Sequence, residues 1–447
     1  MNKDSFYLNI LKKEIIPATG CTEPAAVALA VARAASMHRD IPDSIEVYVS
    51  EYIYKNGKGV GIPKTGMTGL EIAAAIGGIS RTPPYDLQIF SRLCDREIQA
   101  AKRMKGENKI LVDIAHGSEK IYIRAVCYHN ADSSVAIIRK RHDHFTYVSY
   151  NDDIIIEDDD SDLKINRGEQ NHPLNGAKVG DIYSFCMNVP VEQLYFLKKT
   201  VEMNRYIAED GMRSDYGLRV GKSIKDNVDL GLMCDDVTNY AIALTAAAAD
   251  ARMSGSTLPV MSTAGSGNQG LTASLPVIAF AEKMNIEGES KLRALALSEL
   301  ITIHAKGFIG RMSALCGCSI AASIGACAGI VYMLGGGMHQ IECSIRIMVA
   351  DIAGVICDGA KPGCALKIAT AVSAAARAAF LAVKGVGAAS YDGIVDLDVE
   401  KTLQNLGCLG NKGMKNTNTA ILTMMLAKQE HGSEYQENTG TVERFTI

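Results

Sequence analysis

Cysteines placed beside glycines are the residues of this sequence best suited to metal chemistry. Cys316 and Cys318 flank one glycine, and a long run of small residues separates them from Cys357 and Cys364, which enclose the turn Asp-Gly-Ala-Lys-Pro-Gly. Thiolates are soft ligands that iron prefers, and the amides of glycine turns can approach the sulfurs of an iron–sulfur cluster. The stretch therefore indicates such a cluster, although cysteines with long gaps are a weaker signal than the paired Cys-x-x-Cys of zinc sites.

A fifth cysteine stands where a helix is expected to begin. Pro17 and Gly20 interrupt one helical pattern, and the alanine-rich run from Thr22 predicts another, with Thr22 as its N-cap. Cys21 would then lie at the positive end of the helix dipole, which stabilises a thiolate and lowers the thiol pKa. Three roles are open for Cys21: a catalytic base, a fourth cluster ligand, or an ordinary residue at a helix start.

Two glycine-rich loops suggest a site for a small anion. The segment 265–270 matches the Gly-x-Gly-x-x-Gly pattern of dinucleotide sites, but no convincing strand precedes it, which argues against a nucleotide. Its Ser266 and Asn268 can donate hydrogen bonds to the carboxylate of an amino acid, and the alternative is a plain glycine turn. Pro63 replaces the glycine that a phosphate loop requires before Lys64, so ATP is rejected. Lys64 is a candidate to neutralise a substrate, although an exposed loop lysine is the commoner case.

Arg311 is a charged residue in an otherwise apolar helical region. A buried arginine needs a carboxylate or a similar partner, because an unpaired guanidinium is costly to remove from water. That partner is either structural or the substrate itself, and both interpretations are open.

The order of these segments resembles the iron–sulfur L-cysteine desulfidase family, which is related to the alpha chain of bacterial iron–sulfur L-serine dehydratases. Besides the cysteines, the resemblance rests on segments 17–24, 59–66, 264–270 and 306–311. It implies that Cys318 rather than Cys316, together with Cys357 and Cys364, holds a [4Fe–4S] cluster. Three protein ligands leave one iron open to act as a Lewis acid.

The resemblance also implies a lyase that breaks L-cysteine down to pyruvate, ammonia and hydrogen sulfide. A base would remove the α-proton while the thiol leaves, and Cys21 is favoured as that base because the other three cysteines are assigned to the cluster. L-serine dehydratase needs the same parts and is the nearest alternative. An alternative of another class is a non-catalytic iron–sulfur sensor, which the polar loops disfavour. A pyridoxal phosphate lyase is weaker still, since no lysine stands out for its Schiff base.

Composition bounds the partners and the location. The 447 residues carry 46 basic and 50 acidic side chains mixed along the chain, so no basic footprint for nucleic acid or an acidic membrane appears. The uncharged run 313–337 is mostly small residues, which favours a buried helix over a membrane span. Without an apolar signal core at the start, we expect a cytoplasmic protein with reduced thiols. An amino acid is the expected small-molecule partner, with no nucleic acid and no membrane, and a homo-oligomer stays open.

Hydrophobic periodicity predicts an α+β fold. Between residues 44 and 150, runs in which apolar and polar residues alternate indicate an antiparallel sheet with two accompanying helices, at 68–76 and 85–104. Beyond Val189 the pattern is helical, without strands, and rich in alanine. The predicted domains are N-terminal helices that bear Cys21 and pack near the cluster (1–43), an α+β domain (44–188) and an all-helical cluster-binding domain (189–447).

Overall fold

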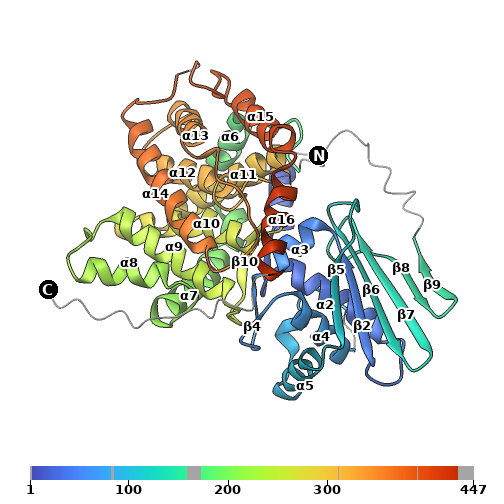
Figure 1. Ribbon diagram of the computed structural model, residues 1–447. Coiled ribbons are helices and arrows are strands. Elements are labelled where there is room, and N and C mark those ends of the chain that lie inside the picture. The colour runs from blue at the N-terminus through green and yellow to red at the C-terminus, as the bar shows by residue number, and fades with distance from the viewer. Residues whose placement is uncertain (1–2, 82–84, 159–172, 311, 390, 431–447) are drawn as a thin grey trace.

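The predicted α+β fold is present in the computed structural model, which describes residues 3–81, 85–158, 173–310, 312–389 and 391–430. A mixed sheet with helices packed against it adjoins a larger body built mainly of helices (Figure 1). The described residues form two buried cores, one in each part.

The main sheet contains all the strands that alternation predicts. Within the described residues its order is β5 (Ile110–Ile114), β2 (Ser44–Val49), β6 (Tyr122–His129), β7 (Asp132–Arg139), β8 (Phe145–Tyr150) and β9 (Asp153–Glu157). All neighbours pair antiparallel except β2 and β5, which pair parallel. The expectation of a purely antiparallel sheet is wrong at that edge, because the chain crosses through helices between β2 and β5 and returns in the same direction.

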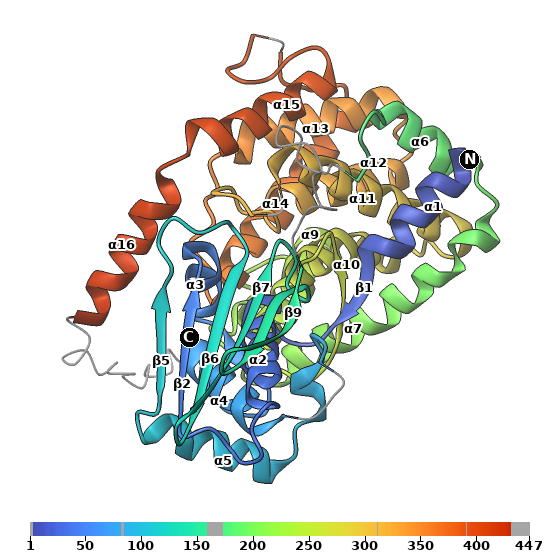
Figure 2. The ribbon, with the colours of Figure 1, turned by 90° about the vertical axis from the view of Figure 1, so that its right-hand side faces the viewer.

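Helices α2 (Thr22–Ala35) and α4 (Leu70–Ile79) pack against this sheet, and α5 (Asp95–Gly106) packs against α4 (Figure 2). Every second residue of β2 is buried, as expected for a strand with one face on a core. The helix predicted over 85–104 is shorter than expected. It starts at Asp95 because the Glu97 carboxylate accepts the backbone N–H of Cys94 (2.9 Å) and caps the helix there.

The second part is helical, and its helices pack closely through small residues. A short helix, α3 (Glu51–Gly57), follows β2 in the chain. The helices of the second part are α6 (Val179–Asn188), η3 (Val191–Leu197), α7 (Lys198–Arg213), α8 (Val220–Asp229), α9 (Val237–Met253), α10 (Gly267–Lys283), α11 (Gly288–Ile309), α12 (Ala321–Met333), α13 (Met338–Ile352), α14 (Cys364–Val383), α15 (Val399–Cys408) and α16 (Thr417–Glu430). The predicted buried helix in 313–337 is α12. All its residues from Ala321 to Val331 are buried, which suits tight contact with α11.

One strand pair joins the chain start to the helical part. The first helix, α1 (Lys3–Glu14), ends before Pro17, and β1 (Ile15–Ala18) pairs antiparallel with β10 (Val260–Thr263). The expectation of no strand beyond Val189 is therefore wrong. A four-residue strand stabilised by a partner so distant in sequence leaves no periodic pattern of its own.

The N-terminal segment contributes to both cores. Tyr7, Leu11 and Ile15 lie in the helical core, whereas the buried face of α2 lies in the core under the sheet. The predicted domain limits at residues 43 and 188 stay a prediction. Among the described residues, only α14 is long and apolar enough to cross a membrane, and half of its apolar window is buried inside the protein.

The α2–α4 contact yields a stability test. A β-carbon at Gly77 would overlap the backbone carbonyl oxygen of Ala28, whereas one at Gly106, the last residue of α5, meets nothing within 4 Å. Gly77→Ala should lower the free energy of unfolding by about 1–3 kcal/mol, the usual cost of overpacking. Gly106→Ala should change it by less than about 0.5 kcal/mol. Urea unfolding of both variants measures the difference, and equal stabilities would contradict the close packing.

Candidate functional site

Backbone pairing brings the two cysteine segments together. The N–H of Cys316 donates to the Val355 carbonyl (2.9 Å), and the N–H of Cys357 donates to the Ala314 carbonyl (2.7 Å). These bonds place the Cys316–Cys318 turn against the segment that leads to Cys357 and on to Cys364, the first residue of α14. The sulfurs of Cys316 and Cys318 lie 3.6 Å apart.

The four thiols lie within electrostatic reach of one another. A hydrogen bond with Cys318 lowers the pKa of Cys316, and the charge of Lys367 contributes in the same direction. The same bond, together with burial and the neighbouring Cys316, Cys364 and Cys357, raises the pKa of Cys318. Burial, followed by the nearby Cys316, raises the pKa of Cys364 to about 12. The thiols therefore influence each other's ionisation, as members of one group do.

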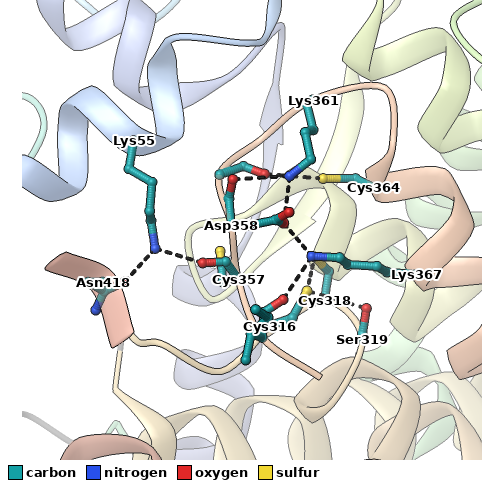
Figure 3. A network of polar contacts seen from close by, with 12 residues as sticks. Lys55, Cys316, Cys318, Ser319, Cys357, Asp358, Lys361, Cys364, Lys367 and Asn418 are labelled. Carbon is teal, nitrogen blue, oxygen red and sulfur yellow. Dashed lines mark hydrogen bonds and ion pairs between the residues drawn. The ribbon is translucent and has the colours of Figure 1, made fainter. Parts of the chain in front are cut away.

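Three lysines surround this cysteine group (Figure 3). Lys361 and Lys367 both contact the carboxylate of Asp358, the first at 2.5 Å. Although burial opposes it, their hydrogen bonds lower the pKa of Asp358 to about 2. Lys55 of α3 is fully buried and donates from Nζ to the carbonyl of Cys357 (2.8 Å) and to Oδ1 of Asn418 (2.6 Å). Burial lowers the pKa of Lys55. The thiols therefore lie among positively charged side chains.

The donor set fits an iron–sulfur cluster. Soft sulfur ligands converge from two loops, and the neighbouring lysines would offset the negative charge that thiolates bring. Gly359 has φ +93°, and a β-carbon there would strike the carbonyl oxygen of Lys55, so the loop can lie this close only with glycine. In the described chain no three His, Cys, Asp or Glu side chains could hold a single metal ion. A single ion needs every sulfur within about 2.3 Å of one point. A cluster of several irons binds each thiolate at a different iron, so its ligands lie farther apart.

The glycine loops named from the sequence meet around this group. A β-carbon at Gly59 would lie 3.3 Å from the Ala360 carbonyl oxygen, so the 59–66 loop touches the Cys357–Cys364 turn. A β-carbon at Gly317 would lie 2.5 Å from Oε1 of Gln269, which places the first turn of α10 against the Cys316–Cys318 turn. Segments scattered from residue 59 to residue 364 therefore form one continuous region.

Beside this region lies a second polar group, centred on Arg252. Its guanidinium, buried near the end of α9, donates to Oδ1 of Asn268 (3.0 Å) and to the carbonyl of Gly20 (2.8 Å). Cys21, next to Gly20, is 4% exposed, and burial raises its pKa to about 11 despite the charge and hydrogen bond of Arg252. The expectation of a lowered pKa is wrong, because desolvation outweighs the helix dipole. The N-cap of α2 is Cys21, not Thr22.

Comparisons with known proteins identify the family of this chain. A family model described as serine dehydratase alpha chain matches residues 85–423, which include all four clustered cysteines and Arg252. The chain belongs to the serine dehydratase alpha-chain family. Similar relatives are UPF0597 proteins of Oleidesulfovibrio alaskensis (41% identical, covering 95% of this chain and 98% of the relative) and Alkaliphilus oremlandii (40%, 96% and 100%). Another, from Parabacteroides distasonis, is 39% identical over 94% of this chain and 97% of its own length.

In this member of the serine dehydratase alpha-chain family, five of the eight predicted site residues fall into two groups. Cys318, Cys357 and Cys364 lie together, and Asn268 lies with Cys21 at Arg252. Exposed Lys64 instead donates to the carbonyl of Leu93 (2.7 Å). Ser266 is half-buried at the N-cap of α10, and its backbone pairs with Thr263. Arg311 lies outside the described residues.

Sequence reasoning missed the basic residues of the site. Lys361 lies inside the cysteine turn and Lys367 one turn into α14, so their nearness to the thiols could have been anticipated. Arg252 stands with Asp250 in an alanine-rich helix, the same signal that singled out Arg311. Nothing around Lys55 predicts its burial, since its helix also contains other polar residues of the kinds usually found at the surface.

The buried carboxyl of Glu299 is linked through Thr263 to the first turn of α10. Thr263 donates from Oγ1 to Oε2 of Glu299 (2.6 Å), and its carbonyl accepts the side-chain amide of Gln269 (3.1 Å). Glu299 is fully buried, and no described group bonds its Oε1. Burial raises the pKa of Glu299 from 4.5 to about 8. The native state therefore holds this carboxyl protonated at a pH where the unfolded chain ionises it.

A pH-dependent stability follows from Glu299. Because its folded pKa is raised, its contribution is present below pH 4.5 and is lost as the pH rises through about 8. Each pH unit in that window costs about 1.4 kcal/mol. Glu299→Gln, which mimics the neutral acid, should melt higher than the parent at pH 8.5 and no higher at pH 4.5. Exposed Glu192→Gln is the control. Calorimetric melting that shows parallel pH slopes for parent and Glu299→Gln would reject the neutral carboxyl.

Proposed function

We propose that this protein is an L-cysteine desulfidase that eliminates hydrogen sulfide from L-cysteine and leaves pyruvate and ammonia after hydrolysis. The proposal holds that Cys318, Cys357 and Cys364 bind a [4Fe–4S] cluster. The observation that carries it is the convergence of four thiols from two loops under Lys55, Lys361 and Lys367. Membership of a lyase family supports it.

The chain's own residues divide the work in this proposal. When bound, a cluster with one iron free of protein ligands supplies a Lewis acid for the departing sulfur. The lysines offset the charge of the thiolates, and Lys55 fixes the Cys357 carbonyl. Asn268 and Ser266 at the start of α10 are the proposed contacts for the amino acid. Cys21 stays the predicted base, and Arg252 is the group that would stabilise its thiolate.

L-serine dehydratase is the second candidate. The description of the matching family model favours it, and elimination of water from serine needs the same carboxylate contacts and the same base. The two activities differ in the leaving group, and a soft thiolate suits iron better than a hydroxyl. For either reaction we propose a cytoplasmic protein with an amino acid as partner and no nucleic acid or membrane.

Iron content tests the ligand set. Protein prepared without oxygen should be brown and contain about four irons per chain, as a cubane cluster requires. Cys318→Ala, Cys357→Ala and Cys364→Ala should each remove most of the iron, because each deletes a thiolate ligand. Cys316→Ala and Cys21→Ser should retain it. Iron and sulfide assays with absorption spectra measure this. A colourless, iron-free and fully active protein would end the cluster proposal.

Parallel product analysis decides between the substrates. Anaerobic protein offered L-cysteine should release sulfide and pyruvate in equal amounts, with L-serine turned over at least about tenfold less efficiently by kcat/KM, since the better leaving group ionises more readily. If L-serine is the faster substrate, the dehydratase replaces the desulfidase. If neither L-cysteine nor L-serine yields pyruvate while iron is present, the result favours the non-catalytic sensor.

A further inference from the structure

Arg252 is a buried cation without an anionic partner. It is 5% exposed, and it contacts an amide oxygen of Asn268, a backbone carbonyl of Gly20 and the thiol of Cys21. Among the described residues no carboxylate forms an ion pair with it, and its Nε, also buried, has no hydrogen-bond partner. Removing a guanidinium from water without a counter-charge is costly, so such an arrangement persists where a ligand supplies the anion.

The acidic residues that lie next to this group in the sequence are directed elsewhere. Asp250 is two positions before Arg252 on α9, and side chains at that spacing do not face each other. Its Oδ2 accepts the backbone N–H of Gly221 (3.1 Å). Glu23, close to Cys21, accepts from the side-chain amide of Asn56 (3.0 Å). The positive charge of Arg252 is therefore not neutralised by either group.

The guanidinium faces the first turn of a long helix. A β-carbon at Gly267 would lie 2.6 Å from Cζ of Arg252, so glycine is what lets α10 begin directly over the cation. No side chain caps the N-terminus of this 17-residue helix. Unpaired backbone N–H groups and the positive end of the helix dipole favour an anion there. The cation and the helix end therefore lie directly against each other.

The position relative to the thiols identifies the kind of anion. Asn268 contacts Arg252, and its neighbour Gln269 lies against Gly317 between Cys316 and Cys318. An anionic ligand bound at Arg252 would therefore lie near the cysteine group, because consecutive residues of α10 contact the two. A small molecule with a carboxylate at one end and a thiol or hydroxyl at the other is the kind of ligand that would contact both groups.

We propose that Arg252, with the first turn of α10, binds the α-carboxylate of the amino-acid substrate, and that the carboxylate replaces Gly20 and Asn268 as its partner. This inference rests on the proposed function for the identity of the substrate. Binding requires the Gly20 carbonyl to release its bond, so the chain start and the end of α9 separate when the ligand enters. Cys21, which shares the guanidinium, is thereby brought beside the bound amino acid.

The test measures preference for a free carboxylate. For the anaerobic protein we compare kcat/KM for L-cysteine and for L-cysteine methyl ester, and independently the rise in melting temperature produced by L-serine and by L-serinamide. The parent protein should prefer the carboxylate in both assays. Arg252→Gln should reduce the kcat/KM preference about 10- to 100-fold, the range expected for a lost charge-assisted hydrogen bond, and abolish the difference in melting temperature. Arg252→Lys should retain part of both.

A second variant tests the proposal if Arg252→Gln does not fold. Asn268→Asp places a carboxylate 3.0 Å from Nη1 of Arg252, so it should neutralise the cation internally, fold, and lose the carboxylate preference. Arg205→Gln is the control, because Arg205 already pairs with Glu209 and Glu282, and it should keep the preference. An undiminished preference in Arg252→Gln or Asn268→Asp overturns the proposal. The melting assay still applies if no turnover is found, so a wrong reaction and a wrong binding residue give different results.

Discussion

The buried ammonium of Lys55 joins three parts of the chain that are otherwise far apart. It extends from α3 next to the sheet, donates to the carbonyl of Cys357 in the cysteine turn, and donates to Asn418 at the start of α16. Asn418 in turn donates to the hydroxyl of Tyr52, one turn before Lys55 (2.9 Å). A charge that is fully buried tolerates little displacement of its acceptors, because each lost bond exposes the desolvation cost of the cation. The geometry of the cysteine turn is therefore coupled to the contact between the sheet and the helical part.

This coupling explains why the candidate site lies at the junction of the two cores. Close glycine contacts continue the junction on the other side of the turn, where Gly59 meets Ala360 and Gly255 meets Ile62. Neither part alone supplies the whole site: the thiols and Arg252 come from the helical part, and Lys55, Gly20 and Cys21 come from the first sixty residues. Relative movement of the two parts would alter the cysteine group and the Arg252 group together.

The electrostatics of the two groups are complementary. Around the thiols, lysines are partly neutralised by Asp358, which leaves a positive surround for negatively charged sulfur ligands. At Arg252 none of the described residues supplies an acid, and the cation is held by neutral oxygens. In the proposed function, the first group would hold the anionic cluster and the second would bind the carboxylate of the substrate.

The sequence by itself determined the elements and the chemistry of the thiols. Alternation in 44–150 and alanine-rich runs after Val189 predicted the sheet and the helices, since a two-residue or 3.6-residue period is a local property. Cysteines beside glycines marked the candidate cluster site for the same reason. Tertiary structure alone decided the parallel edge strand β5, the pairing of β1 with β10, and the burial of Lys55 and Arg252. It also reversed the expected pKa shift of Cys21, because desolvation depends on which segments close over a thiol, and no local pattern encodes that.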